Sequence, residues 1–403
     1  MVDALRGAGR VRSAAVEEAF RVVPRHLFLP GLRVAEAYAD EAVAVQFAHG
    51  VATSSASQPS MMAIMLEQLD LRPGHRVLEI GAGTGYNAAL MSRIVGPAGA
   101  VTSVDIDEDL VDRAAVHLAS AQVNGVELVA GDGAQGHPSG APYDRIVLTV
   151  GSDDVRPEWV AQLAPGGRLL LPLAVRGSQL SIALDLGPDG VLRCDSVRIC
   201  AFIRLRGSAA SVDASRVVDA LGVALQTPDD LPEPDLALVA DALADPRELH
   251  PTPVPLGAVD VWDGFGLWLA LTEPGTCRLL AVEPTPRFSD DLFPLGSTSG
   301  TVAVTAEPGE EPGAAAVVLA GPAVPGPGAV AVRAFGPAGA ALADRVVDAL
   351  GSWAAAGRPG AADWRLTVVP TGVDAPTLPH PQVVVKRHCR VLAETPTVSV
   401  TEP

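Results

Sequence analysis

Between Arg76 and about Pro172, short runs of β-branched and aliphatic residues alternate with segments of helical periodicity. The expected strands are 76–80, 101–105, 126–130, 145–149 and 168–172, and the expected helices are 85–95, 110–121 and 157–163. Strands that alternate with helices pair in parallel, because each crossover helix returns the chain to the same end of the sheet. The pattern predicts an α/β fold whose mainly parallel sheet is covered on both faces.

Two further strand-like runs, 180–186 and 191–205, have no helix between them, which predicts an antiparallel edge. After Gly207 the regular alternation of strands and helices is lost. The expected elements there are helices at 214–225, 235–244 and 338–356, strands at 366–369 and 382–386, and turns at 307–313 and 321–328. We therefore expect two units: a Rossmann-like domain at 1–207 and a second α/β domain at 208–403.

Charge and composition exclude several classes of protein. The formal net charge is −18 and Lys386 is the only lysine, so a nucleic-acid or anionic-membrane partner is not expected. The most apolar stretch, 314–332, is interrupted by glycine and proline, and the four cysteines lack metal-ligand spacing. We expect a cytoplasmic protein without a metal site; the sequence indicates no oligomeric state.

Three glycines, Gly81, Gly83 and Gly85, follow the first expected strand. Glycine permits positive φ and close approach of a ligand, and the next helix begins with free N–H groups. A dinucleotide fingerprint starting at Gly81 would need glycine where the chain has Tyr86. Preceded by Glu79, the turn instead resembles the first motif of class I methyltransferases, whose acidic residue helps to orient the turn and the amino-acid portion of S-adenosylmethionine.

Two acidic residues follow the next strands. Asp105 ends the second strand about twenty residues after the turn, where a carboxylate can accept both ribose hydroxyls. Asp132 follows the third strand, beside Gly133, in a position to receive the adenine amino group. Alternatively, Asp105 caps the following helix and Asp132 is a turn residue. Their order after successive strands favours a cofactor site, to which we also assign Ile106 and Gly133.

Segments on both sides of this turn narrow the family. Those that resemble protein-L-isoaspartate O-methyltransferases in order and spacing are 22–28, 37–40, 55–59, 131–133 and 143–146. The resemblance covers about residues 15–206, and Ser57-Gln58-Pro59 is its most specific part. It implies S-adenosyl-L-methionine as the cofactor, S-adenosyl-L-homocysteine as the product, and a peptide or protein substrate carrying aspartate or isoaspartate.

The resemblance also implies roles for individual residues. Ser57 corresponds to the active-site serine, near both the methyl acceptor and the cofactor. The remaining expected residues are Thr53 and Ser55 in the catalytic loop, and Ser54, Gln58 and Arg204 at the substrate. A carboxylate acceptor is already ionised at pH 7, so methyl transfer needs positioning and desolvation and no general base.

The chain departs from the family pattern in three places. Six residues separate Gly50 from Ser57 where the family has few, and 150–154 replaces a block of small residues and proline. The family is also normally single-domain, whereas this chain has an additional half. That half contains Trp262, Phe265 and Trp268. These side chains could form a peptide-binding patch, but packing in the core is the favoured interpretation.

These departures lead to three hypotheses. The first is a methyltransferase that esterifies an aspartate in a specific, macrocyclic, ribosomally made peptide, because remote contacts would orient such a substrate. Longer homologues resemble enzymes associated with lanthipeptides, lasso peptides and graspetides, where the ester yields aspartimide or isoaspartate. The second is general isoaspartyl repair. The third is a non-catalytic module that binds cofactor and peptide.

Overall fold

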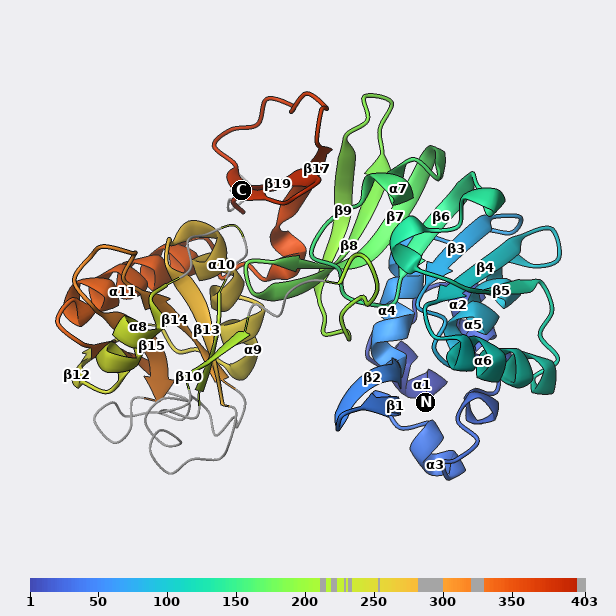
Figure 1. Cartoon of the computed structure of the whole chain (residues 1–403), viewed down its shortest axis with the longest axis horizontal. Coiled ribbons are helices and arrows are strands. Elements are labelled where there is room, and N and C mark those ends of the chain that lie inside the picture. Colours follow the sequence, from blue (N-terminus) through green and yellow to red (C-terminus); the bar gives the residue numbers. More distant parts are fainter. Residues whose placement is uncertain are drawn as a thin grey trace, which may run out of the picture.

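The computed structural model describes residues 1–210, 215–218, 223–227, 230, 234–252, 254–281, 300–319 and 330–396. These residues form two lobes, seen side by side in Figure 1, each built on one large sheet. Across the described part of the chain, no helix combines the length and the apolar character needed to cross a bilayer.

The first lobe contains a ten-stranded sheet with the order β18-β19-β17-β9-β8-β7-β6-β3-β4-β5. Its strands are β3 (Arg76–Ile80), β4 (Ala100–Asp105), β5 (Val126–Ala130), β6 (Tyr143–Leu148), β7 (Leu163–Val175), β8 (Ser178–Leu186), β9 (Leu192–Ile199), β17 (Arg365–Pro370), β18 (Gln382–Val385) and β19 (Cys389–Glu394). Strands β7, β6, β3, β4 and β5 are parallel, and the remaining pairs are antiparallel. The expected Rossmann-like sheet with an antiparallel edge is confirmed.

Helices bury both faces of the parallel strands. The first-lobe helices are α1 (Val2–Gly7), α2 (Ala14–Val22), α3 (Val34–Ala37), α4 (Pro59–Leu69), α5 (Tyr86–Val95), α6 (Glu108–Ser120) and α7 (Pro157–Val160). On β3, Val77 packs with Leu66 of α4 and Leu90 of α5 in one cluster. The next residue, Leu78, belongs to the opposite cluster with Trp159 of α7. Successive residues of a strand point to opposite faces, so this apolar run fits a strand covered twice.

The second lobe is a seven-stranded antiparallel sheet with the order β10-β11-β13-β14-β15-β16-β12. Its strands are β10 (Ser215–Val218), β11 (Val223–Gln226), β12 (Pro246–Pro251), β13 (Thr276–Ala281), β14 (Gly300–Thr305), β15 (Ala314–Leu319) and β16 (Val330–Phe335); its helices are α8 (Leu236–Leu243), α9 (Ala258–Trp262), α10 (Phe265–Thr272) and α11 (Gly339–Ala355). Phe265 and Trp268 of α10 are buried in the core, as favoured from the sequence.

Two expected elements are corrected. The predicted helix at 214–225 is wrong, because its described residues form β10 and β11, which pair antiparallel. Val223 and Leu225 are buried there, so sheet packing overrides local helix propensity. The strand expected at 191–205 ends at Ile199. The turn expected at 321–328 lies outside the described residues.

The chain crosses between the lobes more than once, so residues 208–403 are not one separate unit. Near its end it returns to the first sheet, where Thr367 and Val368 of β17 pair with Arg193 and Leu192 of β9. This return places β17 and β19 beside β9 in Figure 1. A single hydrophobic cluster also spans both lobes, from Leu180 of β8 to Trp353 of α11. The lobes therefore share a core.

Candidate active site

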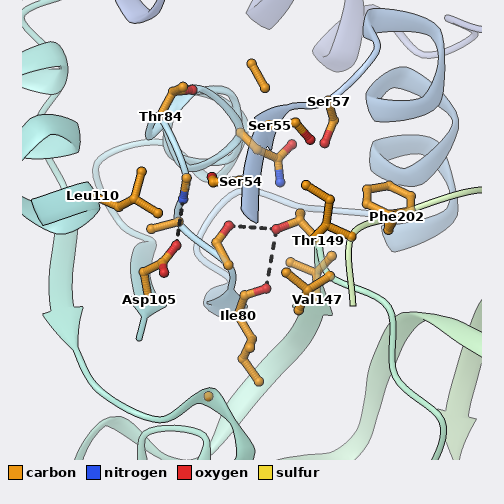
Figure 2. A pocket seen from close by; sticks show the side chains of 18 of the residues that line it. Ser54, Ser55, Ser57, Ile80, Thr84, Asp105, Leu110, Val147, Thr149 and Phe202 are labelled. Carbon is orange, nitrogen blue, oxygen red and sulfur yellow. Dashed lines mark hydrogen bonds between the residues drawn. The ribbon is translucent and has the colours of Figure 1, made fainter. Parts of the chain in front are cut away.

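The strand order reverses direction at β3, which has β4 on one side and β6 on the other. In open α/β sheets, such a switch point leaves a crevice at the carboxyl ends of the strands. A pocket with an empty volume of about 1040 Å³, its open mouth included, lies there. Figure 2 shows Asp105 at one side of this pocket and Ser57 with Phe202 at the other.

The glycine turn forms the floor of the pocket. Gly81, Gly83 and Gly85 all have positive φ (103°, 52° and 84°), which favours glycine at each. A Cβ at Gly81 would lie 2.7 Å from Oγ1 of Thr149, whose hydroxyl donates to the Gly81 carbonyl. At Gly83 a Cβ would lie 3.8 Å from Oγ of Ser54, occupying the space between turn and hairpin. Gly81 and Gly83 line the pocket, while a Cβ at Gly85 would lie 3.2 Å from Cβ of Ala114 in α6.

Glu79 is fully buried beneath the turn and does not line the pocket. Its carboxyl accepts hydrogen bonds from Nδ2 of Asn87 (2.8 Å) and Oγ of Ser103 (2.5 Å). Burial raises its pKa to about 7, and the two hydrogen bonds act in the opposite direction. Asn87 does line the pocket, so Glu79 reaches the site through this amide.

The raised pKa of Glu79 predicts that stability falls with rising pH. Below the ordinary pKa of 4.5 both states are protonated; above it the unfolded chain releases the proton that the folded protein retains until pH 7. From pH 5 to 7 this costs about 2 kcal/mol of unfolding free energy, because each pKa unit corresponds to ~1.4 kcal/mol. Urea unfolding of Glu79→Gln should show this loss removed; an unchanged pH slope would contradict the assignment.

Asp105 lines the pocket and is nearly buried. Its Oδ2 accepts the N–H of Gly83 (3.0 Å) and its Oδ1 that of Asp107 (3.2 Å). Arg206 lies 3.9 Å from Oδ1. Each carboxylate oxygen retains a second lone pair for a ligand. Ile106 also lines the pocket and is partly exposed.

Asp132 does not line the pocket, although the neighbouring Gly133 does. Its carboxylate accepts the N–H groups of Ala134 (2.9 Å) and Ser208 (2.8 Å). Burial acts to raise the pKa of Asp132, but the backbone hydrogen bonds outweigh it and the pKa is lowered. These contacts match the turn reading of Asp132. A Cβ at Gly133 would lie 2.3 Å from Cγ2 of Ile80, so this position requires glycine.

A two-stranded hairpin, β1 (Val43–Ala48) and β2 (Val51–Ala56), supplies the hydroxyl-bearing wall. The expected residues that line the pocket here are Thr53, Ser54, Ser55 and Ser57. Nε2 of Gln46 donates to Oδ2 of Asp107 (2.6 Å), which ties the hairpin to the segment after β4. Gln58 does not line the pocket, because its amide donates to the Asp40 carbonyl outside it.

Two further parts of the wall come from outside the strands. Residues 202–206, including Arg204, form a wall that runs from Phe202, near Ser57, to Arg206, which lies 3.9 Å from Asp105. Thr149 and Val150 line the pocket beside Gly81. Gln179 of β8 holds Phe202 from both sides: its Oε1 accepts the Phe202 N–H, and its Nε2 donates to the Phe202 carbonyl (3.3 Å).

Arg25 is a site residue that the sequence did not predict. Its side chain is buried and lines the pocket, and its Nη2 donates to the Ser57 carbonyl (2.9 Å). Nε donates to the Ala37 carbonyl (2.9 Å), and the guanidinium lies 5.0 Å from the ring centre of Tyr86. Burial lowers the pKa of Arg25. In the sequence, Arg25 is marked only by its place in the segment 22–28, which resembles the family. The sequence does not show that this arginine is buried.

Known proteins resemble this chain in sequence and in fold. Residues 1–210 match the family model described as Protein-L-isoaspartate(D-aspartate) O-methyltransferase (PCMT). A protein-L-isoaspartate O-methyltransferase from Methanopyrus kandleri is 39% identical over 208 residues, 51% of this chain and 90% of that protein. One from Thermotoga maritima is 40% identical over 164 residues, 41% of this chain and 52% of that protein.

The similarity of fold extends beyond residue 210. A solved protein-L-isoaspartate O-methyltransferase aligns over 91% of this chain and 94% of its own, with 23% identity and a TM-score of 0.51. At this identity the alignment concerns the fold alone. Because it includes most of the second lobe, that lobe is not peculiar to this chain.

Proposed function

The chain belongs to the protein-L-isoaspartate(D-aspartate) O-methyltransferase family, and from this premise we propose that it methylates isoaspartyl carboxylates in peptides and proteins. It is an enzyme, a carboxyl O-methyltransferase that uses S-adenosyl-L-methionine. The observation that carries the proposal is one pocket with an acidic side chain at one end and a wall of hydroxyl groups at the other.

The cofactor end of the pocket is suited to S-adenosylmethionine. Gly83 leaves open the space that a Cβ would fill, and Asp105 offers two carboxylate oxygens. We place the ribose at Asp105, the adenine near Ile106 and Gly133, and the amino-acid portion at Gly81. The bound cofactor supplies an electrophilic methyl group on a sulfonium.

The acceptor end lies at β2 and residues 202–206. An acceptor carboxylate is ionised at pH 7, so the protein needs to orient it and exclude water, without removing a proton. Ser57 would donate its hydroxyl to one carboxylate oxygen, with Thr53, Ser54 and Ser55 along the same wall. Arg204 would contribute positive charge toward an acidic substrate.

Ser57→Ala should lower kcat at least tenfold, because it removes one hydrogen bond to the ionised acceptor carboxylate, and a hydrogen bond to a charged group contributes roughly 1.5–3 kcal/mol. The Kd of S-adenosylmethionine should stay within about twofold, since the cofactor end is unaltered. Calorimetry and initial-rate measurements separate the two effects. Ser120→Ala, an exposed serine of α6, is the matched control; equal kcat in both variants would remove Ser57 from the site.

A second candidate substrate is an aspartate of a dedicated, ribosomally made macrocyclic peptide. The six residues between Gly50 and Ser57 form the β2 wall, which supports an acceptor loop of unusual shape. Esterification would activate the aspartate, and the following backbone N–H would expel methanol to give aspartimide. The second lobe is weaker support for this candidate than the sequence alone indicated. A solved protein-L-isoaspartate O-methyltransferase has a similar fold over both lobes.

Mass spectrometry with S-adenosylmethionine distinguishes the candidates. A linear isoaspartyl peptide and a macrocyclic aspartyl peptide would be incubated in parallel. Repair predicts a gain of one methyl group on the linear peptide. Methylation followed by loss of methanol on the macrocycle alone would favour the dedicated enzyme. Cofactor binding with no product from either would favour a non-catalytic module.

The cytoplasmic location stays a prediction.

A further inference from the structure

The segment 150–154, which departs from the family pattern, joins three parts of the molecule. The Gly151 N–H donates to the Ile203 carbonyl (2.8 Å), and the Leu205 N–H donates to the Gly151 carbonyl (2.8 Å). The Ser152 N–H donates to the carbonyl of Pro172 in β7 (2.8 Å). Segment 150–154 therefore braces residues 203–205, which line the acceptor end of the pocket.

The far end of this segment is held by the C-terminal hairpin β18–β19. Oδ2 of Asp154 accepts both the backbone N–H and Nδ1 of His388, each at 2.8 Å. Sγ of Cys389 donates to Oδ1 (3.2 Å). The side chains of Asp154 and His388 are 15% and 25% exposed, so water screens this contact only partly. Because a carboxylate only accepts hydrogen bonds, the Nδ1 atom of His388 carries the proton.

The residues between Asp154 and the pocket are closely packed. A Cβ at Gly151 would lie 2.2 Å from Nε2 of Gln179, the side chain that holds Phe202 from both sides. A shift of segment 150–154 therefore meets Gln179 and the backbone of 203–205 together. Close-packed contacts of this kind transmit displacement.

We propose that Asp154 and His388 are positioning residues, through which the C-terminal hairpin fixes the acceptor wall at 202–206 for peptide binding. The proposal rests on the proposed methyl transfer to a peptide carboxylate. It assigns to the hairpin, 234 residues along the chain from Asp154, a role at the site that it does not touch. The hydrogen bonds of Gly151, Ser152 and Asp154 do not involve Asp105 or Gly81, although Arg206, at the end of the wall, lies 3.9 Å from Asp105.

The test uses the full-length protein with Asp154→Asn and His388→Ala. Each should raise KM for an isoaspartyl peptide about tenfold, within the range of couplings carried through packed contacts. Neither should change kcat or the Kd of S-adenosylmethionine more than about twofold. His388→Asn, whose amide can replace the Nδ1 donor, should recover most of the loss. The matched control is His380→Ala, an exposed histidine of the same region.

Hydrogen exchange provides a readout that needs no turnover. Both variants should speed amide exchange at 202–206 relative to the wild type and to His380→Ala. Unchanged exchange there, or equal losses in kcat and cofactor binding, would overturn the positioning role. If no peptide is methylated but exchange rises as expected, the coupling stands and the proposed substrate fails.

Discussion

Replacing Asp105 with asparagine should weaken the binding of S-adenosylmethionine about a hundredfold. The change keeps the size of the side chain but removes its charge and one of its two acceptor oxygens. Hydrogen bonds to a charged group contribute roughly 1.5–3 kcal/mol each, so about 3 kcal/mol, or a factor of ~100 in Kd, is the expected loss. The residue also fixes the Gly83 N–H, which adds to the effect.

Calorimetric titration with S-adenosyl-L-homocysteine measures this loss directly. Asp112→Asn changes the net charge equally on the exposed side of α6 and is the matched control. Binding should be unchanged in that variant. Equal Kd values for the two variants would mean that Asp105 does not contribute to cofactor binding.

Arg25→Leu should lower the free energy of unfolding by about 4 kcal/mol. The side chain is 1% exposed, and its removal leaves the buried carbonyl of Ala37 and the partly buried carbonyl of Ser57 without their donor. Each such hydrogen bond from a charged group is worth roughly 1.5–3 kcal/mol. Because Ser57 is held through its own carbonyl, kcat should fall as well.

Denaturant unfolding and initial rates measure the two consequences of losing Arg25. Arg21→Leu, four residues earlier, is the control, because Arg21 is 44% exposed and pairs with Glu17 at the surface. Surface pairs contribute about 0–1 kcal/mol, so that variant should remain close to the wild type. Equal destabilisation of the two would show that the buried donors of Arg25 carry no special weight.

The parts of the fold that sequence predicted are those set by local pattern. Strand β3 begins and ends at the predicted residues, and β4 and β5 differ by at most one. Aliphatic and β-branched residues dominate each of these runs, and the glycine turn after Glu79 and Ile80 marks where the first one ends. Such signals need no knowledge of distant partners.

The local sequence pattern predicts less well which individual residues line the pocket. Asp105 and Ser57 line the pocket, whereas Glu79, Asp132 and Gln58 do not. All five lie at the proper ends of strands or beside them. Sequence places a residue near an edge of the sheet, but its tertiary hydrogen-bond partners, such as Asn87 and Ser103 for Glu79, are not visible in the local pattern.

The residues missed altogether depend on distant partners. Arg25 bonds to carbonyls 12 and 32 positions away, and no acidic neighbour in the sequence indicates its burial. The pairing of β17 with β9 likewise follows from tertiary packing, because any half-buried strand could have used that edge.

That pairing also sets an order of events during synthesis. Strands β9 and β17 are about 170 residues apart in the chain, so β9 emerges from the ribosome long before its partner exists. Until then its outer N–H and C=O groups form an open edge, available to another nascent chain. Contacts so remote also close slowly. The growing chain therefore passes through a prolonged aggregation-prone stage that ends only when its last strands arrive.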